Sequence, residues 1–177
     1  MTRDPRYDIL FEPVRIGPKL MRNRFYQTPH DSALDSQSPG SEAYYRAMKA
    51  EGGWAVVNTG HVQVAADFDI LGYQSNARLW DDSDIPNWAL VADRIHEAGA
   101  LAGIELAACG QRCSGFESRL PQRAISNLAD EVWTVSAPYE MDKSDIRGLQ
   151  ADYVAAAKRA RSAGFDIINI HGIEEWA

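Results

Sequence analysis

The stretch "KAEGGWAVVNTG" (residues 49–60) decides the fold. A helical pattern stops at the glycine pair Gly52 and Gly53, because glycine readily takes the left-handed conformation that ends helices. A short apolar, β-branched run over 54–60 follows at once and suits a strand buried on both faces. The stretch therefore predicts a helix followed directly by a buried strand.

The same order recurs twice further along the chain. "HEAGALAGIEL" (96–106) places a stop at Gly99 and a strand over 100–106, and "RSAGFDIINIHG" (161–172) places a stop at Gly164 and a strand over 165–170. The helices before these strands have apolar residues at helical spacing, with predicted N-caps at Ser41, at Asp82 or Ser83, and at Ser144. A first strand is predicted over 22–29. Buried strands that alternate with helices predict an α/β fold with a parallel sheet.

Two architectures fit this alternation: an open doubly wound sheet and a barrel. The nucleotide-binding open sheet requires a glycine-rich G-x-G-x-x-G turn after its first strand, where this chain has "TPHDSALDSQSPGSE" (28–42). The barrel is therefore favoured. We expect the N-terminal half, about four β/α units, of a (β/α)8 TIM barrel, as one incomplete domain over 1–177 with no second domain. The long connection over 107–142 is expected to be a functional loop or a small excursion at the barrel mouth.

Composition excludes several classes of partner. With 18 Lys and Arg against 25 Asp and Glu, the net charge of −7 argues against nucleic acid and anionic membranes as ligands. The sequence shows neither a signal peptide nor a membrane-spanning run, so we expect a cytoplasmic protein. Cys109 and Cys113 cannot alone complete a structural zinc or iron-sulfur site. They are expected to be two thiols, with no metal site in the chain.

In a barrel, the carboxyl ends of the strands surround the active site. The residues that reach this edge include Thr28, Pro29, His30, Asn58, Thr59, Gly60, His61, Glu105 and His171. His171 is the strongest candidate, because a histidine that closes an apolar buried strand needs a polar outlet. His30 and His61 could instead be solvated loop residues, and Glu105 could pair with Arg112 or Arg119. His96 lies on a helix and is expected to serve at the surface or in packing.

Several separated blocks resemble one family of enzymes. They are "RDPRYDILFEPVRIGPKLMRNRFYQTPH" (3–30), "KAEGGWAVVNT" (49–59), "HEAGALAGIEL" (96–106), "EMDKSDI" (140–146) and "AAAKRARSAGFDI" (155–167). In this order they resemble the N-terminal half of the Old Yellow Enzyme-like NADH:flavin oxidoreductases, and most closely the branch of trimethylamine and dimethylamine dehydrogenases. The resemblance implies an FMN-dependent oxidoreductase in which a small-molecule substrate (an amine, an N-methyl compound or NAD(P)H) passes a hydride to FMN.

The resemblance also assigns roles to individual residues. Thr28, Pro29 and His30 would bind the cofactor beside its ring system, Thr59 and Gly60 would pack near it, and Glu105 would face the flavin pyrimidine. His171 would face both flavin and substrate as a catalytic residue, and His61 matches an aromatic residue that helps to surround the substrate. Asp31 stands where amine dehydrogenases of this branch have a cysteine bonded to the flavin, so the resemblance implies noncovalent FMN.

The last five residues, "IEEWA" (173–177), depart from the family pattern, and Glu174 stands where a second polar member of the histidine pair is expected. Four strands would leave a barrel with unpaired edges. The alternative to an enzyme is therefore a catalytically inactive, truncated half-barrel or pseudogene product that self-associates through its open edges or does not fold stably alone.

Overall fold

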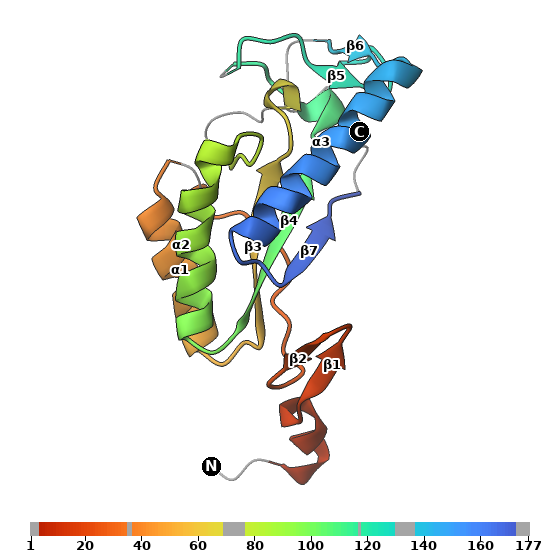
Figure 1. The fold of residues 1–177 in the computed structure, drawn as a ribbon. Helices are drawn as coiled ribbons and strands as arrows, with labels where there is room; N and C mark the ends of the chain where they lie inside the picture. The colour runs from red at the N-terminus through yellow and green to blue at the C-terminus, as the bar shows by residue number, and fades with distance from the viewer. Residues whose placement is uncertain (1–3, 35–36, 69–76, 117, 130–136, 173–177) are drawn as a thin grey trace.

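A computed structural model describes residues 4–34, 37–68, 77–116, 118–129 and 137–172 of the chain. Its centre is a parallel sheet of β3 (Val56–Gln63), β4 (Leu101–Ala107) and β7 (Ile167–Ile170), in the order β3-β4-β7. Helices α1 (Pro39–Glu51), α2 (Ile85–Glu97) and α3 (Lys143–Ser162) pack beside one another and against this sheet (Figure 1). The predicted parallel α/β arrangement is confirmed.

The two faces of the sheet differ in chemistry. Val57, Val62, Ile104 and Leu106 belong to the main core cluster together with apolar residues of the helices. Because side chains alternate along a strand, the rows between them point away from the helices. Those rows pair Asn58 with Gly103, and His61 with Glu105 and Asn169. One face is therefore the helix-covered core, and the other carries polar groups.

A bulge in β3 makes this polar face possible. Between the pairs Asn58 with Gly103 and His61 with Glu105 the register shifts, so that Thr59 and Gly60 stand opposite Ile104 alone. Asn58 and His61 are three positions apart, and a regular strand would direct them to opposite faces. The extra residue returns both side chains to the same face. β3 also continues past the predicted end at Gly60, so His61 lies inside a strand rather than in a loop.

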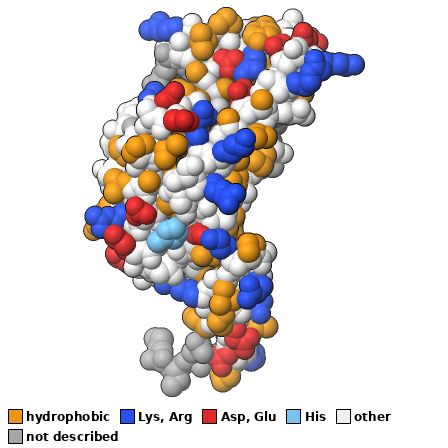
Figure 2. Space-filling view, in the orientation of Figure 1, with side chains coloured by type: hydrophobic (Ala, Val, Ile, Leu, Met, Phe, Trp, Pro, Cys, Tyr) orange, Lys and Arg blue, Asp and Glu red, His pale blue; other side chains and the backbone are white. Residues whose placement is uncertain are grey.

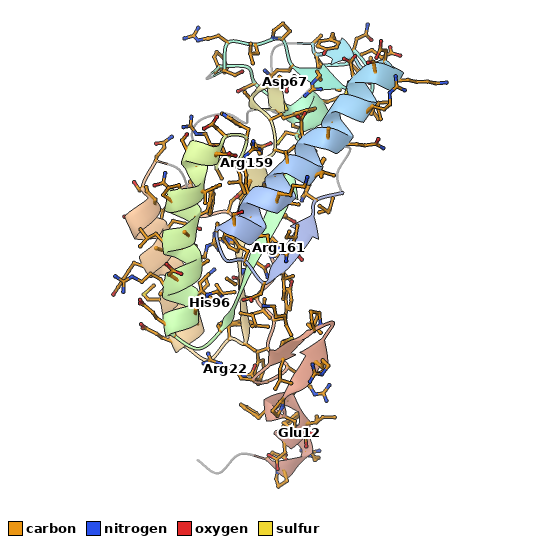
Figure 3. The ribbon with its side chains drawn as sticks, in the orientation of Figure 1. Glu12, Arg22, Asp67, His96, Arg159 and Arg161 are labelled. Carbon is orange, nitrogen blue, oxygen red and sulfur yellow. The ribbon has the colours of Figure 1, made fainter. Side chains whose placement is uncertain are left out.

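The predicted strand over 22–29 is wrong. The segment forms only an isolated parallel bridge between Tyr26 and Val56. The side chain of Asn23 accepts a hydrogen bond from the backbone N–H of Phe25, a local turn that competes with a ladder. The Arg22 guanidinium donates to three backbone carbonyls, those of Ala50, Trp54 and Ala98. Figure 3 shows Arg22 below the helices, so this part of the segment anchors loops instead of pairing along β3.

The helix starts differ from prediction by up to a few residues. The N-cap of α1 is Ser38 rather than Ser41, since Pro39 at the first helical position is already fixed for helix entry. Asp81 caps a 3-10 turn, η3 (Asp82–Asp84), that leads into α2. Asp142, rather than Ser144, caps α3 in a reciprocal capping box with Asp145. The predicted ends at Gly52, Gly99 and Gly164 are confirmed to within two residues.

The N-terminal elements were not predicted, whereas a small excursion was one of the two outcomes expected for the connection over 107–142. The N-terminal region forms the 3-10 helix η1 (Pro5–Phe11) and an antiparallel hairpin of β1 (Val14–Ile16) and β2 (Lys19–Met21), which lies below the sheet in Figure 1. The connection over 107–142 is a small excursion that contains η4 (Gly110–Arg112) and the short parallel pair β5 (Arg123–Ala124) and β6 (Tyr139–Glu140). The 3-10 turn η2 (Ala66–Phe68) follows β3.

The surface carries charges of both signs. On the face drawn in Figure 2, acidic and basic side chains are interspersed among apolar ones, and this face has no broad basic area. Within the described ranges, none of the helices has the length and apolar character needed to cross a membrane.

Candidate functional site

Three side chains from adjacent strands meet at the carboxyl edge of the sheet. Nε2 of His61 on β3 lies 3.6 Å from Oε2 of Glu105 on β4, and Nδ1 of His171, just after β7, lies 3.2 Å from Oε1 of Glu105. The two imidazole rings meet edge to face at 4.4 Å. The side chains are only 21%, 12% and 8% exposed in the order His61, Glu105, His171. Glu105 therefore pairs with two histidines at once, and we call these residues the His61–Glu105–His171 cluster.

Asp31 holds His61 from the side opposite Glu105. Oδ2 of Asp31 lies 2.8 Å from Nδ1 of His61, and Oδ1 accepts a 2.9 Å hydrogen bond from the backbone N–H of His61. A carboxylate facing Nδ1 favours the tautomer with the proton on that nitrogen. The lone pair of His61 is then on Nε2, which is directed at Glu105.

Gly60 allows Asp31 to come this close. A Cβ atom on Gly60 would lie 2.6 Å from Cα of Asp31, a distance that real Cβ atoms do not tolerate. The loop after the first segment can therefore pack on β3 only because residue 60 has no side chain. The backbone bond from His30 N–H to the Thr59 carbonyl, 3.1 Å long, ties the same loop to the bulge.

A further set of polar contacts runs from Asn169, which stands opposite Glu105, to Asn58 in the neighbouring row. Asn169 on β7 donates a 2.6 Å hydrogen bond to Oδ1 of Asn58 on β3, and the Tyr26 hydroxyl donates to Oδ1 of Asn169 at 3.1 Å. Gln27 accepts from the backbone N–H of Asn58 at 2.9 Å. Gly103 stands between these strands, where a Cβ atom would lie 2.7 Å from Cγ of Asn58. These hydrogen bonds connect β3 to β7 across β4 and so hold together the strands that carry the cluster.

A buried ion pair on α1 fixes the loop that carries His30 and Asp31. Nε of Arg46 and Oε1 of Glu42 are 2.5 Å apart, and both side chains are 0% exposed. The Arg46 guanidinium also donates to the carbonyl of His30 at 2.7 Å, while the Ser32 hydroxyl donates to Glu42. The loop is thus attached to α1 through charged, hydrogen-bonded groups that have no access to water.

The other predicted site residues lie along the same edge in different environments. Thr28 and His30 are exposed and Pro29 is half-buried, so all three are at the rim. Thr59 is fully buried; its hydroxyl donates to the Gly60 carbonyl and accepts from the Glu105 N–H. Their roles toward a cofactor stay predictions. Glu174 lies outside the described residues.

Among the ionisable groups near the cluster, Tyr153 of α3 has the most strongly shifted pKa. Burial, together with the nearby Cys109 and Glu105, raises the pKa of Tyr153 to about 12, although a backbone hydrogen bond from Ala108 opposes this. The phenol therefore stays neutral at every physiological pH. Cys109 and Cys113 are buried thiols.

Sequence patterns did not indicate several of these residues. Asp31 stood out only as a departure from a family pattern, and Tyr26 and Asn169 were assigned no role. Glu42 and Arg46 have the spacing of a common surface pair, but Ala43, Ala47 and Ala50 around them mark the buried face of α1, which was the available signal.

The fold and the position of this site are typical of one class of protein, the parallel α/β proteins with a ligand site at the carboxyl edge of the sheet. Parallel α/β enzymes bind their ligands at the carboxyl edge of the sheet, and here that edge carries two imidazoles and two carboxylates with N···O distances of 2.8, 3.2 and 3.6 Å. Such a set can donate, accept and transfer protons near neutral pH.

The chain belongs to the NADH:flavin oxidoreductase / NADH oxidase family, whose sequence pattern matches residues 9–176. It is 41% identical over 182 aligned residues to dimethylamine dehydrogenase of Hyphomicrobium sp. (strain x), an alignment that covers 99% of this chain and 25% of that protein. It is 38% identical to an NADPH dehydrogenase of Listeria welshimeri, covering 92% of this chain and 47% of the relative.

Solved structures of related proteins superimpose on this chain. The histamine dehydrogenase from Rhizobium sp. 4-9 superimposes with a TM-score of 0.91 at 39% identity, over 99% of this chain and 27% of that one. The Old Yellow Enzyme homologue from Zymomonas mobilis, at 20% identity and a TM-score of 0.79, shares the fold. The chain thus spans between about a quarter and a half of the length of these proteins.

Proposed function

We propose that the chain is the N-terminal half of an FMN-binding (β/α)8 barrel and contributes one side of the active site of an FMN-dependent oxidoreductase. The observation that carries the proposal is the His61–Glu105–His171 cluster, which lies at the carboxyl edge of a parallel sheet in a chain of the flavin oxidoreductase family. The partial coverage of every relative described above supports the half-barrel, and a cytosolic location stays a prediction.

The residues present fit the polar edge of a flavin. A flavin pyrimidine presents an N–H donor between two carbonyl acceptors, so it needs an acceptor flanked by donors. Glu105 supplies the acceptor and the imidazole of His171 beside it can supply a donor, and the side chains of the cluster are largely shielded from water. The chemistry of this donor set is therefore complementary to the cofactor.

In this proposal each residue has a physical task. Glu105 accepts from the pyrimidine N–H, while Thr28 and Pro29 at the rim, with Thr59 and Gly60 beneath them, form a surface for the ring. His171 and His61 orient the substrate and exchange protons with it, since imidazole titrates near neutral pH. When bound, FMN supplies the hydride acceptor for an amine, an N-methyl compound or NAD(P)H. Asp31, which replaces the cysteine of the amine dehydrogenase branch, makes the attachment noncovalent.

The test is an FMN titration of the purified chain, followed by quenching of flavin fluorescence. We expect saturable binding, weakened at least about tenfold in Glu105→Ala and His171→Ala. The control is His96→Ala, because His96 lies at the opposite end of the sheet and pairs with Asp166. After acid precipitation, all flavin should remain in the supernatant. Equal binding by Glu105→Ala and the parent chain would contradict the assignment.

A second candidate is a half-barrel that associates with copies of itself. Ile168 and Ile170 of β7 are 38% and 61% exposed, although they share rows with the fully buried Ile104 and Leu106. An exposed apolar edge strand is a site for pairing with another chain. A purified chain that binds no FMN and sediments as oligomers would favour this candidate over the enzyme.

A further inference from the structure

We propose that His61, Glu105 and His171 also form a binding site for one divalent transition-metal ion such as Zn²⁺ or Co²⁺. Among the described residues, this is the group of histidine, cysteine and acidic side chains whose ligand atoms all lie within 4.8 Å of one another. The inference does not rest on the proposed flavin chemistry, because the cluster is present whether or not a flavin binds.

The distances suit a small metal coordination sphere. In tetrahedral zinc sites with metal–ligand bonds of 2.0–2.2 Å, neighbouring ligand atoms lie about 3.3 Å apart. Here Nε2 of His61 and Nδ1 of His171 lie 3.6 Å and 3.2 Å from the two oxygens of Glu105. The ligand atoms all lie within 4.8 Å of one another, so an ion that enters between the three groups would draw them closer by side-chain rotation, and its fourth position would hold water.

Asp31 provides the second requirement of a metal site. Metal-binding histidines usually donate their other ring N–H to a carboxylate, which fixes the tautomer and increases the basicity of the ligand nitrogen. Asp31 is placed for this role toward His61: its Oδ2 lies 2.8 Å from Nδ1, and its Oδ1 accepts a hydrogen bond from the backbone N–H of the same residue. The Nε2 lone pair of His61 is thus directed at the proposed ion before any ion is present.

The ligand types select the class of ion. Two imidazole nitrogens and one carboxylate favour zinc, cobalt, nickel or copper over magnesium and calcium, which prefer oxygen ligands. The two carboxylates of Glu105 and Asp31 supply the negative charge that offsets a dication. Two of the ligands stand on strands β3 and β4 and the third directly follows β7, so the sheet holds them more precisely than long loops would.

This site departs from the expectation of no metal based on the sequence. That expectation rested on the two cysteines, whereas these ligands come from β3, β4 and the residue after β7. Only the parallel register and the bulge at Thr59 and Gly60 place them side by side.

The experiment is a competition titration of the chelator-treated chain with ZnCl₂ and a chromogenic chelator at pH 7.5. We expect one Zn²⁺ per chain. His61→Ala, His171→Ala and Glu105→Gln should each weaken binding at least about 100-fold, and Asp31→Asn, which removes the orienting carboxylate, by about tenfold to 100-fold. His96→Ala is the matched control and should bind as the parent does, with circular dichroism verifying the fold of each variant.

X-ray absorption of the zinc-loaded parent chain provides a test that needs no substitution. Two imidazole ligands with oxygen completing the shell are expected, and sulfur ligands from Cys109 or Cys113 would overturn the proposal. So would unchanged affinity in His61→Ala or His171→Ala. An FMN titration of the same samples separates the two proposals: a chain that binds FMN but no Zn²⁺ keeps the proposed function and refutes the metal site, and the reverse outcome does the opposite.

Discussion

Gly60 determines how closely the loop that carries Asp31 can approach β3. Its Cβ would meet the backbone of Asp31, and backbone cannot rotate away as a flexible side chain can. The carboxylate that orients His61 is therefore placed by the absence of a side chain at the neighbouring position.

Gly60→Ala should lower the free energy of unfolding by about 1–3 kcal/mol, the usual range for overpacking. It should also weaken the binding of any ligand that contacts His61. Urea denaturation measures the first effect and the Zn²⁺ titration the second. Gly40→Ala is the control, because a Cβ there has no atom within 4 Å. Equal stability of the two variants would show that the loop moves aside freely.

The buried pair of Glu42 and Arg46 is the costliest set of charges in the described structure to disturb. Both side chains are 0% exposed. Arg46→Ala should lower the free energy of unfolding by about 3–5 kcal/mol, because it leaves the Glu42 charge buried without its cation. The double variant Glu42→Leu, Arg46→Leu should lose less than the sum of the single changes.

The exposed pair of Arg94 and Glu97 on α2 is the matched control for this experiment. Their side chains are 55% and 61% exposed, and such pairs contribute at most about 1 kcal/mol. Chemical denaturation of all variants under one set of conditions measures the comparison. A loss in Arg46→Ala no greater than in Arg94→Ala would contradict the role of the buried pair.

At the scale of elements, Asp166 joins the N-terminal hairpin to the sheet and to α2. Its Oδ1 accepts from Nζ of Lys19 on β2 at 2.7 Å; its Oδ2 lies 2.8 Å from Nε2 of His96 and accepts the Ala102 N–H at 2.9 Å. His96, labelled at the lower end of α2 in Figure 3, is exposed and pairs with Asp166, so of the two expected roles it has the one at the surface. One carboxylate holds three elements at the end of the sheet opposite the cluster.

The protonation of Asp166 should make this junction sensitive to acid. Burial alone would raise the pKa of Asp166, but hydrogen bonds from Lys19, His96 and Ala102 outweigh burial and lower it below the ordinary 3.8. A carboxyl whose pKa is lower in the folded state stabilises fully above its unfolded pKa, and this contribution disappears as the pH falls through the folded value.

Asp166→Asn should therefore lower the free energy of unfolding by about 2 kcal/mol at pH 7, a value typical of a hydrogen bond to a charged group. The difference from the parent chain should shrink as the pH falls below about 4. Urea denaturation at pH 7, 5 and 3.5 measures it. A difference that stays constant over this range would exclude ionisation of Asp166 as the cause.

At the scale of the whole molecule, the apolar side chains on the helix-facing side of β7 remain partly exposed. Ile168 and Ile170 continue the rows of the fully buried Ile104 and Leu106 but are 38% and 61% exposed. A further helix of a barrel, or another copy of the chain, would cover them at a gain of about 25 cal/mol for each Å² of apolar surface.

Ile170→Lys should therefore reduce concentration-dependent self-association of the chain, since charge on an edge strand opposes pairing. Sedimentation velocity over a range of protein concentrations measures it. Val154→Lys, on an exposed position of α3, is the control. Equal association of both variants would place the contact elsewhere.

The sequence by itself determined the order of the helices and the strands of the parallel sheet. Glycine stops at Gly52, Gly99 and Gly164 and the apolar runs after them act over a few residues, so local physics suffices to place them. The same logic gave Glu105 and His171 their place at the carboxyl edge, since the end of a buried strand is visible in the sequence.

Only the tertiary structure decided which of these residues meet. The bulge at Thr59 and Gly60 turns His61 toward Glu105, and a register shift depends on the partner strand, which no local pattern specifies. Asp31 contacts His61, and Asp166 contacts Lys19, although the two residues of each pair are far apart in the sequence. The elements follow from interactions between sequence neighbours, whereas the site follows from contacts between residues distant in sequence, which exist only once the strands are paired.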